Sequence, residues 1–200
     1  RFGEKGYTVE KLNMQKNKIQ IVWYKRDLRI TDHRPICEAS INAIPTLPIY
    51  IVETDYWKQP FASKRHWSFI HDSLKDLRKD LKNIGQSLIV RSGSVKKIFE
   101  ELSYRYNIIS ILSHEETGNQ WTYDRDKSLQ NWCLLKYISF TEFPSNGIVR
   151  RLKNRSEWSK IRNSRMRKKL VSTPTNLIPL IGVEEGIIPS KEDPVFENNY

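Results

Sequence analysis

The sequence lacks long apolar runs and is poor in cysteine. No stretch approaches the roughly 20 consecutive apolar residues that cross a bilayer, and the first 18 residues have no apolar core of the signal-peptide kind. The two cysteines, Cys37 and Cys133, lie far apart in helix-like segments, so we expect two buried thiols rather than a disulfide or a metal site. These absences predict a cytoplasmic protein that does not bind membranes.

Common motifs for binding phosphates, dinucleotides and metals are also missing. The chain contains no GxGxxG, GxxxxGK[ST], CxxC or HExxH pattern. His66 and His71 are five residues apart and do not share a helix face, whereas His33 and His114 stand alone in the sequence. We therefore predict no metal site and assign no catalytic residue within the 200 residues.

Short β-rich runs alternate with helical patterns along the chain. The chain has 200 residues, of which 38% are hydrophobic and 28% charged, so it is long enough for one domain with a well-packed core and an extension. The runs are mostly continuous Val, Ile and Leu, as expected for strands covered on both faces. We predict strands at 19–24, 47–52, 87–91, 108–113 and 138–142. The alternation predicts an α/β fold with a five-stranded, parallel, doubly wound sheet of the Rossmann-like or flavodoxin-like kind.

The predicted helices carry apolar residues at helical spacing. The clearest helix covers residues 64–84, and its apolar stripe consists of Trp67, Ile70, Leu74, Leu77, Leu81 and Ile84. Further helices are predicted at 94–106 and 122–137. Asp32, followed by Pro35, is predicted to cap the helix after the first strand.

The chain divides into four expected parts. Residues 1–18 are a flexible lead, with Met14 as a possible true start, and residues 19–142 form the α/β domain. Residues 143–171 are a basic, partly helical segment packed on that domain. Residues 172–200 contain four of the nine prolines and no helical period, so we expect an extended linker toward a further domain.

Positive charge is concentrated in one part of the chain. Of the formal net charge of +11, residues 144–170 contribute ten Lys or Arg against the single acid Glu157, a net of 10 − 1 = +9. Interspersed apolar residues favour a structural role, in which Arg150, Arg151 and Arg155 pair with acids of this domain or of a further one. The alternative is an auxiliary attraction to DNA phosphates.

Charged residues follow the first strand at once. Residues 22–35 read VWYKRDLRITDHRP, and these charges must be paired or face a ligand because a lone buried charge is costly. In an open parallel sheet, ligands bind beyond the carboxyl ends of the strands, where the strand order reverses. If the strand order is 3-2-1-4-5, this point lies between the loops at 25–32 and 114–121.

Two interpretations of these loops stay open. Arg26, Asp27 and Arg29 could form an ion-pair network that pins the strand to a helix, or they could face a ligand. In the second loop Glu115 and Glu116 could contact a ligand, whereas Thr122 or Asn119 could cap the next helix.

Several blocks, read in order, resemble the amino-terminal α/β domain of the photolyase and cryptochrome family. They are VWYKRDLRITDHRP, LPIYIVE, KRHWSFIHDSLKDLRKDLKNIG, LIVRSGS and SHEETGNQWTYDRDKSLQNWC. The similarity runs from about residue 19 to about residue 189, and its most specific part is the strand exit WYKRDLR followed by D-H-x-P. The block GIVRRLKNRSEW also resembles a branch of this family.

The resemblance implies a partner domain that is expected to begin about where this chain ends. In such proteins a larger helical domain holds FAD, and the light-excited reduced flavin donates an electron to a pyrimidine dimer flipped out of damaged DNA. The implied cofactor is therefore FAD, and the implied partners are the helical FAD domain of the same chain and damaged DNA. We expect a monomer.

The resemblance also implies an antenna site. In some members the amino-terminal domain seats a second, light-harvesting chromophore at the carboxyl ends of the strands. The first-strand motif matches at positions 25–27, a glutamate follows the second strand, and the second loop adds two polar residues. The predicted antenna site consists of Lys25, Arg26, Asp27, Glu53, Glu116 and Asn119.

The identity of the antenna chromophore is not implied. Lys25 replaces a frequent arginine, and His33 replaces a frequent asparagine. Residues 121–123 lack the Asn-Glu pair that folate-binding members use before their Arg-Asp step, which is matched here by Arg125 and Asp126. This departure argues against a folate antenna, and an empty site is an alternative.

The leading hypothesis is the amino-terminal, antenna-type domain of a DNA photolyase, inactive as an isolated chain. A cryptochrome-type photoreceptor shares this domain and signals without repairing DNA. A third hypothesis is a free-standing nucleotide-binding α/β module. The residues that distinguish the first two are expected beyond Tyr200.

Overall fold

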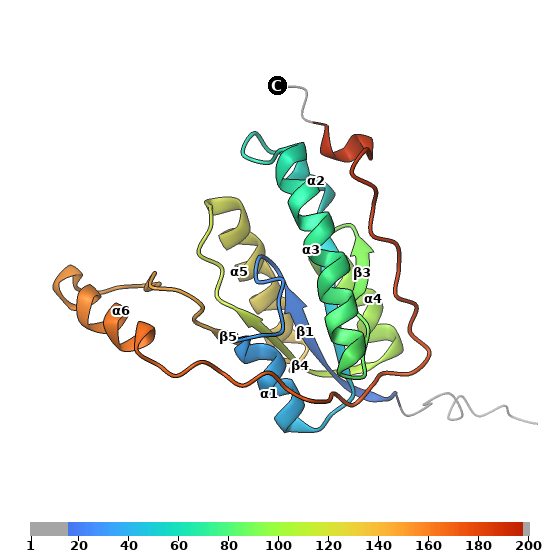
Figure 1. Ribbon diagram of the computed structural model, residues 1–200, viewed down its shortest axis with the longest axis horizontal. Helices are drawn as coiled ribbons and strands as arrows, with labels where there is room; N and C mark the ends of the chain where they lie inside the picture. The colour runs from blue at the N-terminus through green and yellow to red at the C-terminus, as the bar shows by residue number, and fades with distance from the viewer. Residues whose placement is uncertain (1–15, 198–200) are drawn as a thin grey trace, which may run out of the picture.

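The computed structural model describes residues 16–197 as an α/β fold around one parallel sheet (Figure 1). The strands are β1 (Lys18–Tyr24), β2 (Thr46–Val52), β3 (Ile89–Ser92), β4 (Asn107–His114) and β5 (Ser139–Phe143). Their spatial order is β3-β2-β1-β4-β5, and every neighbouring pair is parallel. The predicted fold class is confirmed, the strand order is the one assumed from the sequence, and this order reverses between β1 and β4.

Helices cover both faces of the sheet. One face packs against α1 (Arg34–Asn42) and α3 (Lys64–Asn83), and the other against α4 (Val95–Arg105) and α5 (Gln120–Leu135). The remaining elements are α2 (Thr54–Trp57), η2 (Arg155–Glu157), α6 (Trp158–Met166) and η3 (Pro194–Phe196). The predicted strands and helices are found with their ends shifted by at most two residues. Between residues 16 and 197, no helix is long and apolar enough to span a membrane.

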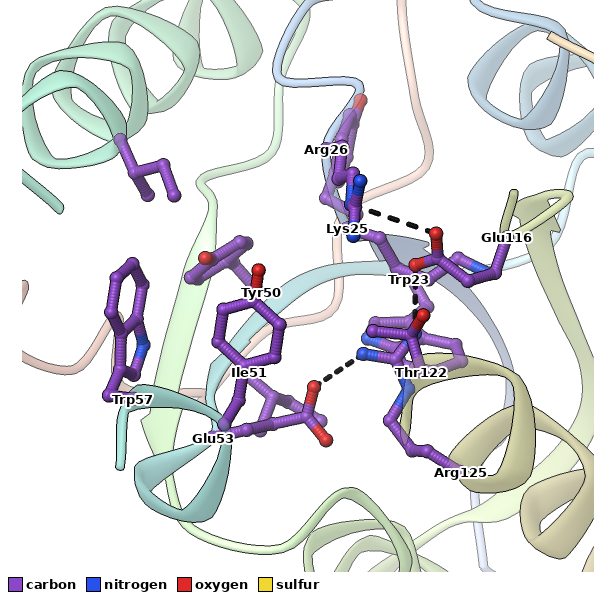
Figure 2. Close-up of a pocket in the computed structure, with 13 residues that line it drawn as sticks. Trp23, Lys25, Arg26, Tyr50, Ile51, Glu53, Trp57, Glu116, Thr122 and Arg125 are labelled. Carbon is purple, nitrogen blue, oxygen red and sulfur yellow. Dashed lines mark hydrogen bonds and ion pairs between the residues drawn. The ribbon is translucent and has the colours of Figure 1, made fainter. Parts of the chain in front are cut away.

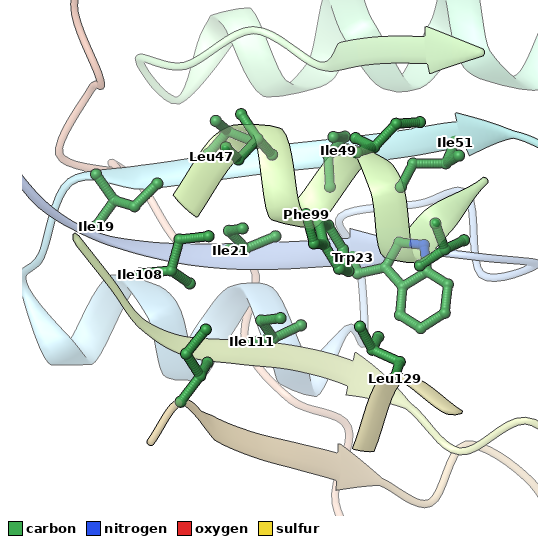
Figure 3. Packing of buried hydrophobic residues seen from close by; sticks show 14 of the residues in the cluster. Ile19, Ile21, Trp23, Leu47, Ile49, Ile51, Phe99, Ile108, Ile111 and Leu129 are labelled. Carbon is green, nitrogen blue, oxygen red and sulfur yellow. The ribbon is translucent and has the colours of Figure 1, made fainter. Parts of the chain in front are cut away.

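The side chains of β1 alternate between the two faces of the sheet. Ile21 and Trp23 point toward α4 and α5, and Trp23 meets Phe99 edge to face at a centroid distance of 5.8 Å (Figure 3). Val22 and Tyr24 point toward α1 and α3. Because both faces are covered, every residue of β1 after the first is buried. The core therefore fixes the position at which β1 emerges at the edge of the sheet.

The predicted cap of α1 is wrong by one residue. His33 is the N-cap, and its Nδ1 atom accepts a hydrogen bond from the backbone N–H of Ile36 at 3.2 Å. Asp32 adopts a left-handed backbone with φ of 46°, which aspartate tolerates, and this turn places His33 rather than Asp32 next to the helix. The Asp32 carboxylate accepts from the backbone N–H of Val171 instead, at 2.9 Å.

The C-terminal segment runs along the domain rather than away from it (Figure 1). The backbone N–H of Leu177 donates to Ile84, and the N–H of Val90 in edge strand β3 donates to Glu185. At its end, Phe196 stacks on Trp67 of α3 with ring centroids 3.9 Å apart. Residues 172–197 thus complete the core beneath α3, and their expected role as an interdomain linker stays a prediction.

The basic segment 143–171 contains the short 3-10 helix η2 and the α-helix α6, and α6 lies to one side of the sheet (Figure 1). None of the α6 residues is buried, and Trp158 and Met166 are 42% and 51% exposed. Only Ile161 and Arg165 of α6 are partly covered. This exposure is greater than the predicted packed apolar face implies.

Two further expectations concern the start of the chain and the two cysteines. The predicted lead over residues 1–18, with Met14 as a possible start, lies outside the described residues except for its last three. Cys133 is a buried thiol as expected, whereas Cys37 is partly exposed.

Candidate functional site

A pocket lies where β1, β2 and β4 end, beside the first turns of α5 (Figure 2). Four of the six predicted antenna residues line it: Lys25, Arg26, Glu53 and Glu116. The aromatic side chains of Trp23, Tyr50, Tyr56 and Trp57 complete much of its wall. The sheet's reversal point therefore forms a polar and aromatic pocket, as the topology predicts.

Lys25 is buried and acts as a fixed cation of the wall. Its Nζ atom lies 2.8 Å from Asp126 and 3.8 Å from Glu142, and 4.7 Å from the centroid of the Trp23 ring. These two carboxylates and the ring compensate a charge that would otherwise destabilise the core.

Arg26 pairs with Glu116 rather than with Asp27, so the ion-pair network that was one of the two interpretations of this loop does not join these two residues. The Arg26 side chain is 57% exposed, and its Nε lies 3.6 Å from Glu116. A Cβ atom at Gly118 would come within 2.3 Å of the Arg26 guanidinium, so glycine lets the second loop pass close to it. Glu116 also accepts from the backbone N–H groups of Thr117 and Gly118, which holds this loop against the end of β1.

Asp27 lies outside the pocket and joins two histidines that are remote in the sequence. Its carboxylate contacts His33 Nε2 at 2.6 Å and His114 Nδ1 at 2.5 Å, and accepts from the backbone N–H of Lys25. Burial by itself would raise the pKa of Asp27, but the hydrogen bonds from His114 and His33 outweigh it and hold the pKa well below its usual value. The histidines that stand alone in the sequence are thus neighbours in space.

The Asp27, His33 and His114 side chains offer three ligand atoms within 4.8 Å of one another. However, His33 Nδ1 already accepts from a backbone N–H, so the ring proton must be on Nε2, facing Asp27. A metal ion on Nε2 would displace that proton and leave His33 with no N–H at all. Burial also lowers the pKa of His33, which favours the neutral ring. The cluster therefore fits a hydrogen-bonded lock between β1, β4 and α1 better than a metal site.

Arg125, on the second turn of α5, occupies the centre of the pocket (Figure 2). It forms ion pairs with Glu53 at 2.5 Å, Glu116 at 3.2 Å and Asp126 at 2.8 Å. Its guanidinium also lies 4.8 Å from the Trp23 ring centroid. Burial raises the pKa of Glu53 to about 7 even though Arg125 opposes the shift.

Sequence reasoning matched Arg125 to a motif but did not place it in the site. The feature of the sequence that could have identified Arg125 as a site residue is its position early in the helix that follows the second polar loop. Asn119, which was placed in the site, caps α5 instead: its Oδ1 accepts from the backbone N–H of Thr122 at 3.1 Å, and Asn119 does not line the pocket.

The pocket is small because Arg125 and its partners fill it. Its cavity is about 60 Å³, and a second cavity of about 160 Å³ lies beyond the Glu53–Arg125 pair and is also lined by both residues. Cavities of this size hold water, whereas small-molecule sites measure roughly 300–1,000 Å³. The Glu53–Arg125 pair thus separates two cavities at the reversal point of the sheet.

Comparisons with known proteins agree with this architecture. Residues 20–160 match the family model described as DNA photolyase. A cryptochrome DASH of Xenopus laevis is 28% identical over 197 residues, covering 88% of this chain and 38% of that protein.

Two solved structures share the fold. A Synechocystis cryptochrome matches with a TM-score of 0.72 at 17% identity, covering 90% of this chain and 40% of that one. A class III photolyase of Agrobacterium tumefaciens matches with a TM-score of 0.71 at 20% identity, covering 92% and 41%. The chain thus spans about two-fifths of the length of the relatives it matches.

Proposed function

Because the chain belongs to the DNA photolyase family, we propose that it is the amino-terminal, antenna-type domain of a light-dependent DNA photolyase. The observation that carries the proposal is the family match over residues 20–160, which includes both loops of the pocket and the whole sheet except the first two residues of β1. In the complete polypeptide, a helical domain would hold FAD and bind damaged DNA. We assign no residue of this chain to the flavin, and we expect the protein to be a monomer.

The pocket as folded does not fit a chromophore of flavin size. A cavity of about 60 Å³ is several times too small, and the Arg125 guanidinium lies where a ring system would have to stack on Trp23. An antenna chromophore would bind here only after Arg125 had moved away from Glu53. The proposed contacts of such a ligand are then Lys25, Arg26, Glu53 and Glu116. Whether the site opens depends on whether the Glu53–Arg125 ion pair separates.

The alternative function is that of a blue-light photoreceptor without repair activity. The Xenopus relative and the Synechocystis neighbour both carry the name cryptochrome. The same domain and the same pocket serve either function, since the chemistry that separates them belongs to the flavin domain.

The deciding experiment is a repair assay on the complete polypeptide with reduced FAD bound. Oligonucleotides that contain a thymine dimer are illuminated with blue light, and restored thymine is quantified by chromatography. We expect light-dependent repair and none in the dark. If a protein with photoreducible FAD repairs neither single-stranded nor duplex substrate, the photolyase proposal is wrong and the photoreceptor function replaces it.

A further inference from the structure

We propose that the exposed side of α6 and the residues after it form a binding surface for single-stranded nucleic acid. We call this the α6 surface, and it consists of Trp158, Lys160, Arg167, Lys168 and Lys169. The inference does not depend on flavin chemistry, because it concerns a surface of this chain alone. It rests on unpaired charge, on the hollows around α6 and on one exposed aromatic ring.

Most cations of the basic segment have no acidic partner. Arg150 pairs with Glu142 at 2.7 Å, and Arg165 pairs with Glu115 at 3.5 Å. The other eight are exposed and form no ion pair with any residue in the range 16–197: Arg151, Lys153, Arg155, Lys160, Arg162, Arg167, Lys168 and Lys169. The structural role expected for Arg151 and Arg155 is therefore not supported by partners in this domain. An unneutralised excess of this size attracts polyanions.

The inner side of α6 is held against the loop that follows β5. Arg165 donates to the carbonyl of Ile148 at 2.7 Å, in addition to its pairing with Glu115. The Arg162 side chain lies so close to Gly147 that a Cβ atom there would approach it to 2.9 Å. These contacts hold α6 in a defined orientation, and Lys160 of the helix and residues 167–169 after it are exposed.

Three cation-lined hollows adjoin one another around α6. The largest, of about 580 Å³, separates the end of α6 from the start of α1 and is lined by Arg34, Lys168 and Lys169 among others. Two more, of about 540 and 470 Å³, are lined by Lys160 and Lys168 among others. Because Lys168 borders all three, they adjoin one another at this residue, and the acids Glu157 and Asp32 also contribute to their linings. A repeating polyanion fits several adjoining hollows better than one small anion does.

Trp158 supplies a stacking platform at the start of α6. Its side chain is 42% exposed, and the Arg162 guanidinium lies 5.8 Å from the ring centroid. Unpaired bases stack on exposed aromatic rings, whereas the bases of a duplex are already stacked within the helix. An aromatic ring beside cationic hollows therefore points to a single strand rather than to a duplex.

The test is a fluorescence anisotropy titration of a short fluorescein-labelled oligo(dT) with the 200-residue chain. One variant combines Lys160→Ala, Arg167→Ala, Lys168→Ala and Lys169→Ala. The matched control removes the same charge elsewhere, through Lys75→Ala, Lys79→Ala, Lys97→Ala and Lys136→Ala, all at exposed positions without ion pairs among the described residues. Circular dichroism confirms that each variant is folded.

We expect the α6 variant to weaken binding at least about tenfold, and to reduce the slope of log K against log salt by about 3, the value for four lost phosphate contacts on a single strand. The control variant should change the affinity less than about twofold. Trp158→Ala should weaken binding severalfold without altering the salt slope, because stacking releases no counterions.

Three results would overturn the proposal. Equal weakening by the two quadruple variants would show attraction by net charge alone. Unchanged affinity in Trp158→Ala, or tighter binding of a duplex than of oligo(dT), would contradict a single-strand surface. Binding of phosphatidylserine vesicles in the absence of any oligo(dT) binding would assign the charge to a membrane surface instead.

Discussion

The consecutive charges at the end of β1 have three different surroundings. Lys25 joins the buried carboxylates of Asp126 and Glu142, Arg26 lies half-exposed beside Glu116, and Asp27 bonds to two histidines. Two of these charges can be buried because each has specific partners from other elements. The motif therefore fixes the tertiary structure at the edge of the sheet, and only part of it faces the pocket.

Asp27→Ala tests the buried lock between β1, β4 and α1. Removing the carboxylate leaves the ring N–H groups of His33 and His114 buried without an acceptor, so we expect a loss of about 3 kcal/mol in the free energy of unfolding. Urea denaturation at neutral pH measures it. Asp55→Ala, whose side chain is 74% exposed, is the control and should change stability by less than about 0.5 kcal/mol. A loss below about 1 kcal/mol in Asp27→Ala would contradict the lock.

The same variant has a defined pH dependence. The folded-state pKa of Asp27 lies below its unfolded value of about 3.9, so its contribution is present above that pH and is lost as the pH falls through the folded pKa. The difference in stability between wild type and Asp27→Ala should therefore be largest above pH of about 5 and shrink in stronger acid.

Glu53→Gln tests the ion pair that divides the pocket. Since burial raises the folded pKa of Glu53 to about 7 against about 4.3 when unfolded, the wild type binds more protons when folded and loses stability as the pH rises between these values. The free energy of unfolding of Glu53→Gln minus that of wild type should therefore increase by on the order of 2 kcal/mol from about pH 4.5 to about pH 8. Unfolding at both pH values measures this, with exposed Glu184→Gln as control. A difference that is constant with pH would refute the shifted titration.

At the scale of elements, the C-terminal segment closes the hydrophobic core. Edge strand β3 gains a backbone partner from Glu185, and Phe196 fills a space between Trp57 and Trp67. Sequence patterning could not predict this packing, because isolated apolar residues in an extended chain carry no periodicity. Their burial depends on the surface that α2 and α3 offer.

Phe196→Ala should therefore destabilise the domain by about 3 kcal/mol, in the range of buried Phe→Ala changes. Ile187→Ala, which truncates a side chain that is 86% exposed on the same segment, should have little effect. Chemical denaturation compares the two variants. If Phe196→Ala unfolds at the wild-type denaturant concentration, the segment does not contribute to the core.

At the scale of the whole molecule, the chain presents two separate regions. The pocket lies at the carboxyl edge of the sheet, and the unpaired cations lie on α6 and in the residues on either side of it. Figure 1 shows α6 to one side of the sheet. The small volume of the pocket and the proposal that a further, helical domain holds FAD lead to one expectation for the isolated chain.

We expect the 200-residue chain, purified alone, to retain no stoichiometric FAD and to repair no dimers under blue light. An absorption spectrum and a repair assay test this. Stoichiometric yellow flavin together with light-dependent repair would show that these residues suffice for the activity, and would refute the assignment of the flavin to a further domain.

The parallel α/β sheet and the family could be predicted from the sequence alone, whereas the strand order could only be assumed. The patterns behind these predictions are local: the continuous apolar strands, the apolar stripe from Trp67 to Ile84 and the YKRDLR strand exit. Such patterns can be recognised from neighbouring residues without knowing any tertiary contact. The tertiary structure decided the partners. It paired Asp27 with His33 and His114, placed Arg125 between Glu53 and Glu116, and left most cations of the basic segment without an acidic partner among the described residues. Ion pairs and hydrogen bonds depend on distances between residues far apart in the chain, and only the fold sets those distances.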